Sequence, residues 1–220
     1  MRTVFVDVDS QLDFLFPAGA LYVPGAERIL GSIARLSRFA AAQGMMVIST
    51  TDAHAEDDPE FARWPHHCVT GTNGQHKAES TLLERRVTVP SGTGLLAGRQ
   101  GGAGFSPPTT GREAGPATIE IEGAQQIVVE KQTVDIFLAP NLTRVLDGLK
   151  AGRYVLYGVV TEICVLYAAR GLLQRGQTVD LVTDAIEALT PEGSRRAIEE
   201  IVAGGGRLAT VEEITGGSGR

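Results

Sequence analysis

The 220-residue sequence contains only two cysteines, Cys68 and Cys164. Two cysteines cannot build the disulfide framework that stabilises many small secreted domains. A low cysteine content fits a reducing compartment, where a thiol stays available for chemistry. We therefore expect a cytoplasmic protein, and we examine each cysteine as a candidate reactive group.

Long apolar runs and basic blocks are also missing. No apolar run approaches the roughly 20 residues that a transmembrane helix requires, so we expect no membrane partner. The first residues enter a strand-like pattern at once, which predicts that no signal peptide is present. The formal net charge is −6 and no cluster of basic residues occurs, so nucleic acid is not an expected partner.

The remaining pattern predicts one α/β domain over residues 1–220, because single domains reach about 250 residues. Strand-like and helical segments alternate, which is typical of βαβ units and a mostly parallel sheet. The predicted strands are 4–8, 45–49, 127–130, 155–160 and 178–182, with a possible edge strand at 208–211. The predicted helices are 24–43, 140–150, 161–173 and 194–203.

Residues 72–126 are the least informative part of the sequence. Glycine, proline, serine and threonine dominate between residues 90 and 116, which favours a long surface loop or irregular hairpin over a second domain. We place this insert at about 88–120 and expect it to cover either the site or an oligomer interface. Its glycines are not framed by a strand and a helix, so they do not form a dinucleotide-binding fingerprint.

Cys164 lies where the predicted strand 155–160 passes into a helix, with Thr161 as the candidate N-cap. A thiol in a first helical turn is favoured as thiolate by the helix dipole. Free N–H groups of the same turn are suited to hold an oxyanion. Glu162 would oppose the thiolate if its side chain pointed inward. In the alternative interpretation, Cys164 is simply a small buried apolar residue.

Two further candidates follow predicted strands. Asp9 follows the first strand and could act as a general base, although Asp7 lies on the same side and either could reach the end of the sheet. Lys131 follows the third strand, where the commoner role is a solvated lysine. Because the carboxyl ends of parallel strands open on one side, Asp9, Lys131 and Cys164 can converge there.

A cluster of possible metal ligands follows the second predicted strand. Asp52 and His54 are two residues apart in an extended segment and can face one point, which Glu60 and His67 could approach from the next loop. Carboxylate and imidazole groups suit Zn²⁺, Fe²⁺ or Mn²⁺. The spacing is not that of a zinc finger, and a polar surface loop with scattered histidines remains the alternative.

Five segments, in the same order, resemble those of the isochorismatase-like cysteine hydrolases, and within them the nicotinamidases. They are the sequences VDSQLDF at 8–14, DAH at 52–54, WPHHCVTGT at 64–72, VEK at 129–131 and GVVTEICV at 158–165. The resemblance implies a flavodoxin-like three-layer α/β/α fold. It also implies that Cys164 is the nucleophile, Asp9 the base and Lys131 the cationic partner of the base.

The same resemblance implies further site features. The backbone N–H groups of Val160 and Cys164 would form an oxyanion hole, after a non-proline cis bond between Val159 and Val160. The metal ligands would be Asp52, His54 and His67, with Glu60 in place of a histidine that some nicotinamidases carry. The implied metal is divalent, zinc first and iron or manganese as alternatives. Phe14 and Trp64 would line a pocket for a flat ring.

The expected activity is hydrolysis of a small-molecule amide, with nicotinamide as the preferred substrate and a Cys164 thioester as the intermediate. A carbamoyl compound, maleamate or ureidoacrylate is the nearest alternative substrate. A non-catalytic flavodoxin-like interaction module is a third hypothesis, which an unreactive Cys164 without a metal would favour. The resemblance also favours a homo-oligomer.

Overall fold

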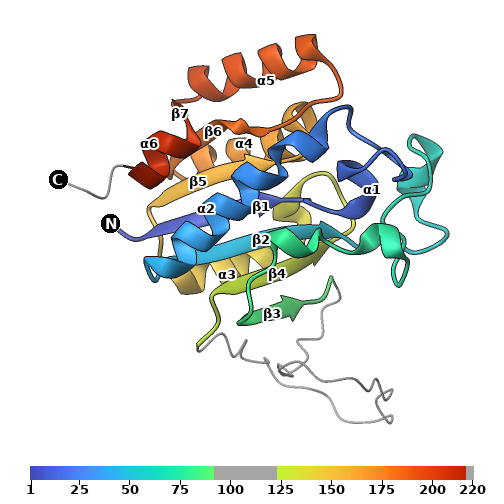
Figure 1. The fold of residues 1–220 in the computed structure, drawn as a ribbon, viewed down its shortest axis with the longest axis horizontal. Coiled ribbons are helices and arrows are strands. Elements are labelled where there is room, and N and C mark those ends of the chain that lie inside the picture. The colour runs from blue at the N-terminus through green and yellow to red at the C-terminus, as the bar shows by residue number, and fades with distance from the viewer. Residues whose placement is uncertain (92–122, 217–220) are drawn as a thin grey trace.

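The computed structural model describes residues 1–91 and 123–216 (Figure 1). Within these residues, all strands form one parallel sheet in the order β3-β4-β2-β1-β5-β6-β7. The strands are β1 Thr3–Val8, β2 Met46–Asp52, β3 Arg86–Val89, β4 Gln126–Lys131, β5 Arg153–Gly158, β6 Thr178–Ile186 and β7 Arg207–Ala209. This arrangement confirms the prediction of a mostly parallel sheet.

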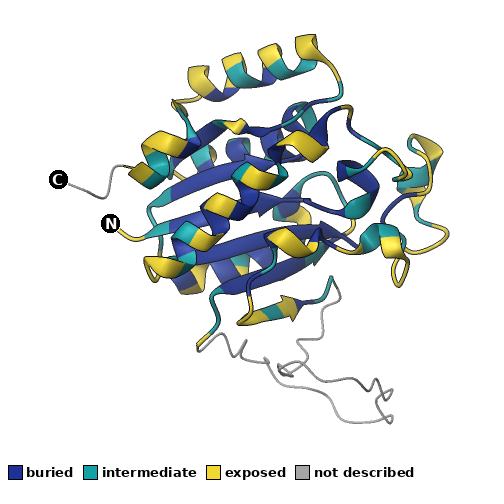
Figure 2. Cartoon of the chain, viewed as in Figure 1, coloured by how far each residue is buried: buried dark blue, intermediate teal, exposed yellow. Residues whose placement is uncertain are grey.

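The central strands are apolar and buried on both faces, as parallel sheets require. Every residue of β2 is buried, and β1 is buried from Val4 onward. Figure 2 shows the central strands as a buried layer, whereas the edge strand β3 is largely exposed and the surrounding helices alternate between buried and exposed residues. These runs are apolar on both faces because helices cover both sides of the sheet.

Helices cover the two faces and make a three-layer α/β/α fold (Figure 1). One face carries α1 (Leu12–Leu15), η1 (Ala26–Ile29), α2 (Leu30–Ala42) and α6 (Val211–Gly216). The other carries α3 (Leu142–Leu149), α4 (Leu166–Gln174) and α5 (Pro191–Ala203). Shorter helical turns are η2 (Pro59–Ala62), η3 (Asn73–Gln75), η4 (Glu79–Thr81), η5 (Ile136–Leu138) and η6 (Thr161–Val165).

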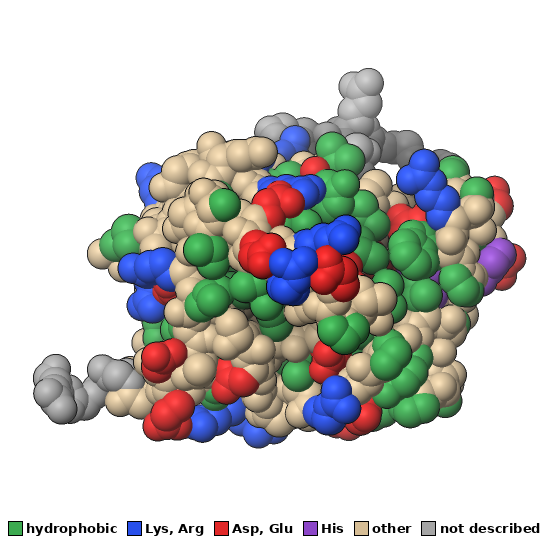
Figure 3. Space-filling model, turned by 90° about the horizontal axis from the view of Figure 1, so that it is seen from above, with side chains coloured by type: hydrophobic (Ala, Val, Ile, Leu, Met, Phe, Trp, Pro, Cys, Tyr) green, Lys and Arg blue, Asp and Glu red, His purple; other side chains and the backbone are tan. Residues whose placement is uncertain are grey.

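Helix α5 shows how the outer layer is held. Its buried residues Ala197 and Ile201 belong to the apolar core. Its outer side pairs arginines with glutamates, which lie side by side over this face in Figure 3. Exposed pairs of this kind each contribute only about 0–1 kcal/mol. The burial of the apolar side therefore fixes the helix.

The structure differs from the predicted elements in several places. The predicted helix 24–43 is divided into η1 and α2, and the predicted edge strand 208–211 is β7, followed at once by α6. Strand β3 was not predicted, because it has only four residues and buries only Val89. The predicted insert at 88–120 overlaps β3 at residues 88 and 89, and its residues 92–120 lie outside the described residues.

Among the residues that the structure describes, no helix is both long and apolar enough to cross a membrane. The central strands β4, β2, β1 and β5 are neighbours in the sheet. Their carboxyl ends therefore open side by side on the edge of the sheet next to α1 (Figure 1). Residues that follow these four strands are brought together there.

Candidate active site

Asp9 follows β1 and turns away from the strand direction. Its φ of 48° lies in the left-handed region, which aspartate tolerates better than most residues. The Asp9 N–H donates to Oγ1 of Thr50 (3.3 Å), and that hydroxyl donates to Oδ1 of Asp9 (2.7 Å). Asp9 is buried and its other oxygen, Oδ2, is directed to Lys131.

Lys131 is the last residue of β4 and lies between two carboxylates. Its Nζ is 2.9 Å from Oδ2 of Asp9 and also contacts Oδ1 of Asp52, the last residue of β2. All three residues are buried. Because one ammonium faces two carboxylates, this group carries a net negative charge when both carboxylates are ionised.

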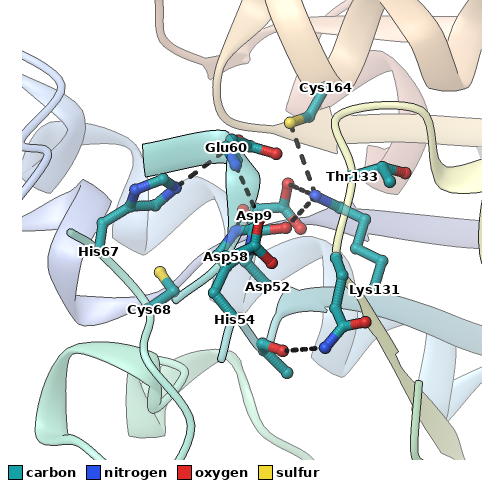
Figure 4. Close-up of polar contacts among 12 residues, drawn as sticks. Asp9, Asp52, His54, Asp58, Glu60, His67, Cys68, Lys131, Thr133 and Cys164 are labelled. Carbon is teal, nitrogen blue, oxygen red and sulfur yellow. Dashed lines mark hydrogen bonds and ion pairs between the residues drawn. The ribbon is translucent and has the colours of Figure 1, made fainter. Parts of the chain in front are cut away.

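Cys164 approaches the same ammonium from the opposite side, with Sγ 3.7 Å from Nζ of Lys131 (Figure 4). It is carried by η6, which follows β5 after a cis bond between Val159 and Val160. The predicted convergence of the strand ends is therefore observed, since Asp9, Lys131 and Cys164 meet at one point.

The local structure at Cys164 differs from the predicted helix cap. The segment Thr161–Val165 starts as a π-turn with Val160 as its N-cap, and the Thr161 side chain does not cap it. Instead, the N–H and hydroxyl of Thr161 both donate to the carbonyl of Glu187, at 2.9 and 2.8 Å. The prediction that Thr161 caps the helix is wrong because its hydroxyl joins this turn to the segment after β6.

The sequence left open whether Glu162 points inward and opposes a thiolate at Cys164. In the structure it is bound elsewhere. Its carboxylate accepts hydrogen bonds from the N–H groups of Leu189 (3.3 Å) and Thr190 (3.1 Å). Glu162 therefore joins η6 to the loop between β6 and α5.

Burial raises the pKa of the Cys164 thiol well above its ordinary value. Lys131 opposes this shift, while Asp9 and Asp52 add to it. The helix dipole favours the thiolate, as the sequence predicted. However, Cys164 is only 6% exposed, and the loss of solvent around its sulfur outweighs the effect of the dipole. Burial therefore favours the neutral thiol of Cys164 over the thiolate.

The two carboxylates beside Lys131 differ in proton affinity. Burial raises the pKa of Asp9 although Lys131 opposes it, and the neighbouring charge of Asp52 adds to the increase. Burial acts on Asp52 in the same direction, but Lys131 and His54 lower its pKa to about 2. For Lys131, burial alone would lower the pKa, yet Asp52 and Asp9 raise it well above its usual value. Asp9 is therefore the carboxylate better suited to accept a proton.

Asp52, His54 and His67 form a buried group of possible metal ligands. Each presents one ligand atom, and these atoms all lie within 4.8 Å of one another. The two loops that carry the histidines are joined by backbone hydrogen bonds, from His54 N–H to Cys68 O (3.1 Å) and from Thr70 N–H to His54 O (2.9 Å). The structure thus brings together three of the four residues predicted to bind a metal.

The chemistry of this group fits a divalent cation. Nε2 of His54 is buried and has no hydrogen-bond partner among the described residues. It lies 3.9 Å from Oδ2 of Asp52. Burial would lower the pKa of His54, but Asp52 and Asp58 raise it to about 9, which shows that a positive charge is favoured here. A buried imidazole nitrogen without a partner, next to a carboxylate, is suited to ligate zinc.

Glu60 lies beside this group without being one of its three members. Its Oε1 is 4.0 Å from Nε2 of His67 (Figure 4). His66 is turned elsewhere, with its ring stacked on Phe61 at a centroid distance of 4.2 Å.

A cavity of about 380 Å³, its open mouth included, lies above these residues. Asp9, Asp52 and Cys164 line it together with His67 and Glu60. Its other walls are largely apolar and consist of Phe14, Leu21, Trp64, Val134, Val159, Val160, Ile163 and Leu189. Phe14 and Trp64 line this cavity, and the Phe14 ring is 5.4 Å from that of His67.

Comparison with known families assigns the chain. The model of the isochorismatase domain matches residues 3–213. The chain belongs to the isochorismatase family. The family resemblance stated from the five sequence segments is therefore confirmed, and so is the expectation of a hydrolase of this family.

Solved structures of this family share its fold. A nicotinamidase from Bacillus subtilis matches with a TM-score of 0.74 and 22% identity, over 95% of this chain and 99% of its own. A pyrazinamidase of Pyrococcus horikoshii in complex with zinc gives 0.72 and 24%, over 96% and 99%. An N-carbamoylsarcosine amidase from Thermoplasma acidophilum gives 0.69 and 22%, over 96% and 98%. No curated protein shows significant sequence similarity to the chain.

Sequence reasoning missed two residues that support the site of this isochorismatase-family protein. The Gln11 side chain donates to Asp52 O (2.9 Å) and accepts from Asp52 N–H (2.7 Å), which fixes the end of β2. Thr50 holds Asp9, as described above. Thr50 stands out in the sequence as a polar residue in a buried strand, and Gln11 lies within the family-like segment 8–14.

Proposed function

We propose that the chain is a cysteine-dependent amidohydrolase, with nicotinamide as the best candidate substrate and nicotinate and ammonia as products. One observation carries this proposal. The ammonium of Lys131 lies 2.9 Å from the carboxylate of Asp9 and 3.7 Å from the sulfur of Cys164, and both of these residues line the cavity. This arrangement provides a nucleophile, a base and a fixed positive charge.

In the first step, Asp9 accepts the thiol proton while Sγ of Cys164 attacks the amide carbon. The raised pKa of Asp9 supports this role, because a base of higher proton affinity can remove a proton from a buried thiol. The negative charge that develops on the carbonyl oxygen would be held by the N–H groups of Val160 and Cys164.

In the second step, protonated Asp9 gives its proton to the leaving nitrogen, and the C–N bond breaks to release ammonia. The acyl group remains on Cys164 as a thioester. Asp9 then takes a proton from water, whose oxygen attacks the thioester carbon. The C–S bond breaks, Asp9 gives that proton to Sγ of Cys164, and the acid leaves, which restores the thiol. Lys131 stabilises the charge of the carboxylate through both steps.

Asp52, His54 and His67 would hold a divalent cation, with Glu60 as the candidate fourth ligand. Zinc is the preferred metal, since the donor set suits it and the Pyrococcus horikoshii pyrazinamidase was solved with zinc. When bound, such a cation supplies a Lewis acid that can hold the ring nitrogen of a pyridine amide. Phe14 and Trp64 would then lie along the ring.

A related amidase is the second candidate, favoured by the structural match to N-carbamoylsarcosine amidase. A carbamoyl compound, maleamate or ureidoacrylate would be its substrate. The metal-binding group and the apolar cavity support the ring amide over these acyclic ones. A cavity with Cys164 at its base also supports an enzyme over a non-catalytic interaction module.

The test of this proposal compares Cys164→Ala with wild type in an ammonia-release assay. We expect wild type to release ammonia from nicotinamide and C164A to lose at least about 10³-fold in kcat, because no covalent intermediate can form. Cys68→Ala is the matched control, since Cys68 is buried and does not line the cavity. Full activity of C164A would overturn the proposal. If wild type hydrolyses only acyclic amides, the second candidate function is selected.

We also propose a single-domain cytoplasmic homo-oligomer. The family match over residues 3–213 supports one domain, and two buried, unpaired cysteines suit a reducing compartment. Light scattering after gel filtration measures the subunit number.

A further inference from the structure

We propose that Asp58 is a positioning residue of the metal site, where it sets the tautomer of His54 and the place of Glu60. This inference rests on the metal site proposed above. Asp58 precedes η2 and its side chain is 10% exposed. Asp58 is not a member of the ligand group.

Both oxygens of the Asp58 carboxylate are used. Oδ2 lies 2.9 Å from Nδ1 of His54, and Oδ1 accepts a hydrogen bond from the N–H of Glu60 at 2.9 Å. Asp58 thereby joins an imidazole in the ligand group to the start of the turn that carries Glu60 (Figure 4). One side chain therefore controls two elements of the site.

The first contact decides which nitrogen of His54 is free to bind metal. A carboxylate accepts a hydrogen bond, so Nδ1 carries the proton and the lone pair of neutral His54 lies on Nε2. Nε2 is the buried nitrogen without a hydrogen-bond partner among the described residues. His67 is set in the same way, because its Nδ1 lies 2.7 Å from the carbonyl of Pro65. Both imidazoles therefore present Nε2.

The second contact fixes the loop. By accepting from Glu60 N–H, Asp58 caps η2 and holds Glu60 with its Oε1 4.0 Å from Nε2 of His67. The same turn places the Phe61 ring 5.4 Å from the His54 ring. Loss of the Asp58 carboxylate would therefore disturb the imidazole and the neighbouring carboxylate together.

The test is Asp58→Asn, which keeps the size of the side chain but offers one acceptor oxygen to two donors. One of the two contacts must be lost. Groups that orient metal ligands typically contribute about 10–100-fold to metal affinity, so we expect D58N to bind Zn²⁺ 10–100-fold more weakly than wild type. Zn²⁺ affinity is measured by competition with a chromogenic chelator.

Asp57→Asn is the matched control. It removes the same charge from the neighbouring, exposed position of the same loop, and we expect its Zn²⁺ affinity to equal that of wild type. A second readout is the His54 tautomer in metal-free protein, measured by ¹⁵N NMR at a pH above the His54 pKa of about 9, where the imidazole is neutral. We expect Nδ1–H in wild type and D57N, and a shift towards Nε2–H in D58N.

If D58N does not fold, Asp58→Ser replaces it. Serine is a good N-cap but is too short to reach His54, so the same loss of affinity is expected. Equal affinity and an unchanged tautomer in D58N and D57N would overturn the inference while leaving the metal site intact. If wild type binds no Zn²⁺ and His54→Ala behaves identically, the proposed metal site itself fails.

Discussion

At the scale of single residues, the Thr50 hydroxyl fixes the carboxylate that is proposed to be the base. It accepts from the Asp9 N–H and donates to Asp9 Oδ1 (2.7 Å). With Oδ1 held in this way, Oδ2 is left to face Lys131 at 2.9 Å. Without that hydroxyl, the carboxylate would lose the contact that orients it in a buried site.

Replacing Thr50 by valine should therefore lower activity without unfolding the protein. Hydrogen bonds to charged groups contribute about 1.5–3 kcal/mol, so T50V should reduce kcat roughly 10–100-fold with little change in KM. Steady-state ammonia release measures both constants. Thr51→Val, one residue along the same buried strand, is the control, and Thr50→Ser should restore most of the activity. Equal kcat values for T50V and T51V would contradict the role of the hydroxyl.

The sequence predicted which strand-end side chains lie together better than it predicted their surroundings. Asp7 and Asp9 were both possible, because alternate residues of a strand share a face. The structure separates them through the φ of 48° at Asp9. Asp7 stays in the strand and pairs with Lys77 at 3.1 Å. A backbone dihedral of this kind depends on tertiary contacts such as the one with Thr50, so the sequence alone does not predict it.

At the scale of elements, the connection from β5 to η6 places Cys164 beside β1. Gly158 has a φ of 120°, and a Cβ on it would lie 2.1 Å from the carbonyl oxygen of Val8. Only glycine allows the chain to pass so close to the neighbouring strand. This close approach brings the turn after β5 next to Asp9.

Gly158→Ala should consequently be strongly destabilising. Steric overlap with a backbone atom and a left-handed φ together should cost roughly 3–5 kcal/mol of unfolding free energy. Gly148→Ala in α3 is the matched control, because a Cβ there meets nothing within 4 Å and alanine should stabilise that helix by about 0.5–1 kcal/mol. Urea unfolding followed by circular dichroism measures both. A G158A protein as stable as wild type would refute the proposed close approach.

Strands and helices could be predicted from the sequence where the burial of an apolar run is enough to determine them. The fully buried β2 and the strand ends that carry Asp9 and Lys131 follow from apolar runs and the polar residues after them. Strand β3 and helix α6 were not predicted, since each is short and buries few residues. The capping error at Thr161 has a similar origin, because the partner of its hydroxyl, Glu187, is 26 residues away in sequence.

At the scale of the whole molecule, a bound cation would link the loop of His54 to that of His67 and stabilise the native state. A ligand at 1,000 times its Kd adds about 4 kcal/mol if it binds only the folded protein. For a chain of this size that corresponds to a rise of about 10 °C in Tm. Zn²⁺ should therefore raise the Tm of wild type, and a chelator should reverse the increase. Differential scanning calorimetry tests this, and an identical rise in His54→Ala would contradict the assigned ligands.

The order of the sheet also determines when the site can exist. Strand β1 lies between β2 and β5, and its residue Val4 pairs with Tyr154. Ribosomes add about 5–20 residues per second, so Asp9 is synthesised roughly 10–30 s before Cys164. Until β5 docks, the nascent chain holds the proposed base without the proposed nucleophile. A truncated or stalled product would therefore be catalytically silent, and hydrolysis starts only in a protein whose synthesis has passed η6.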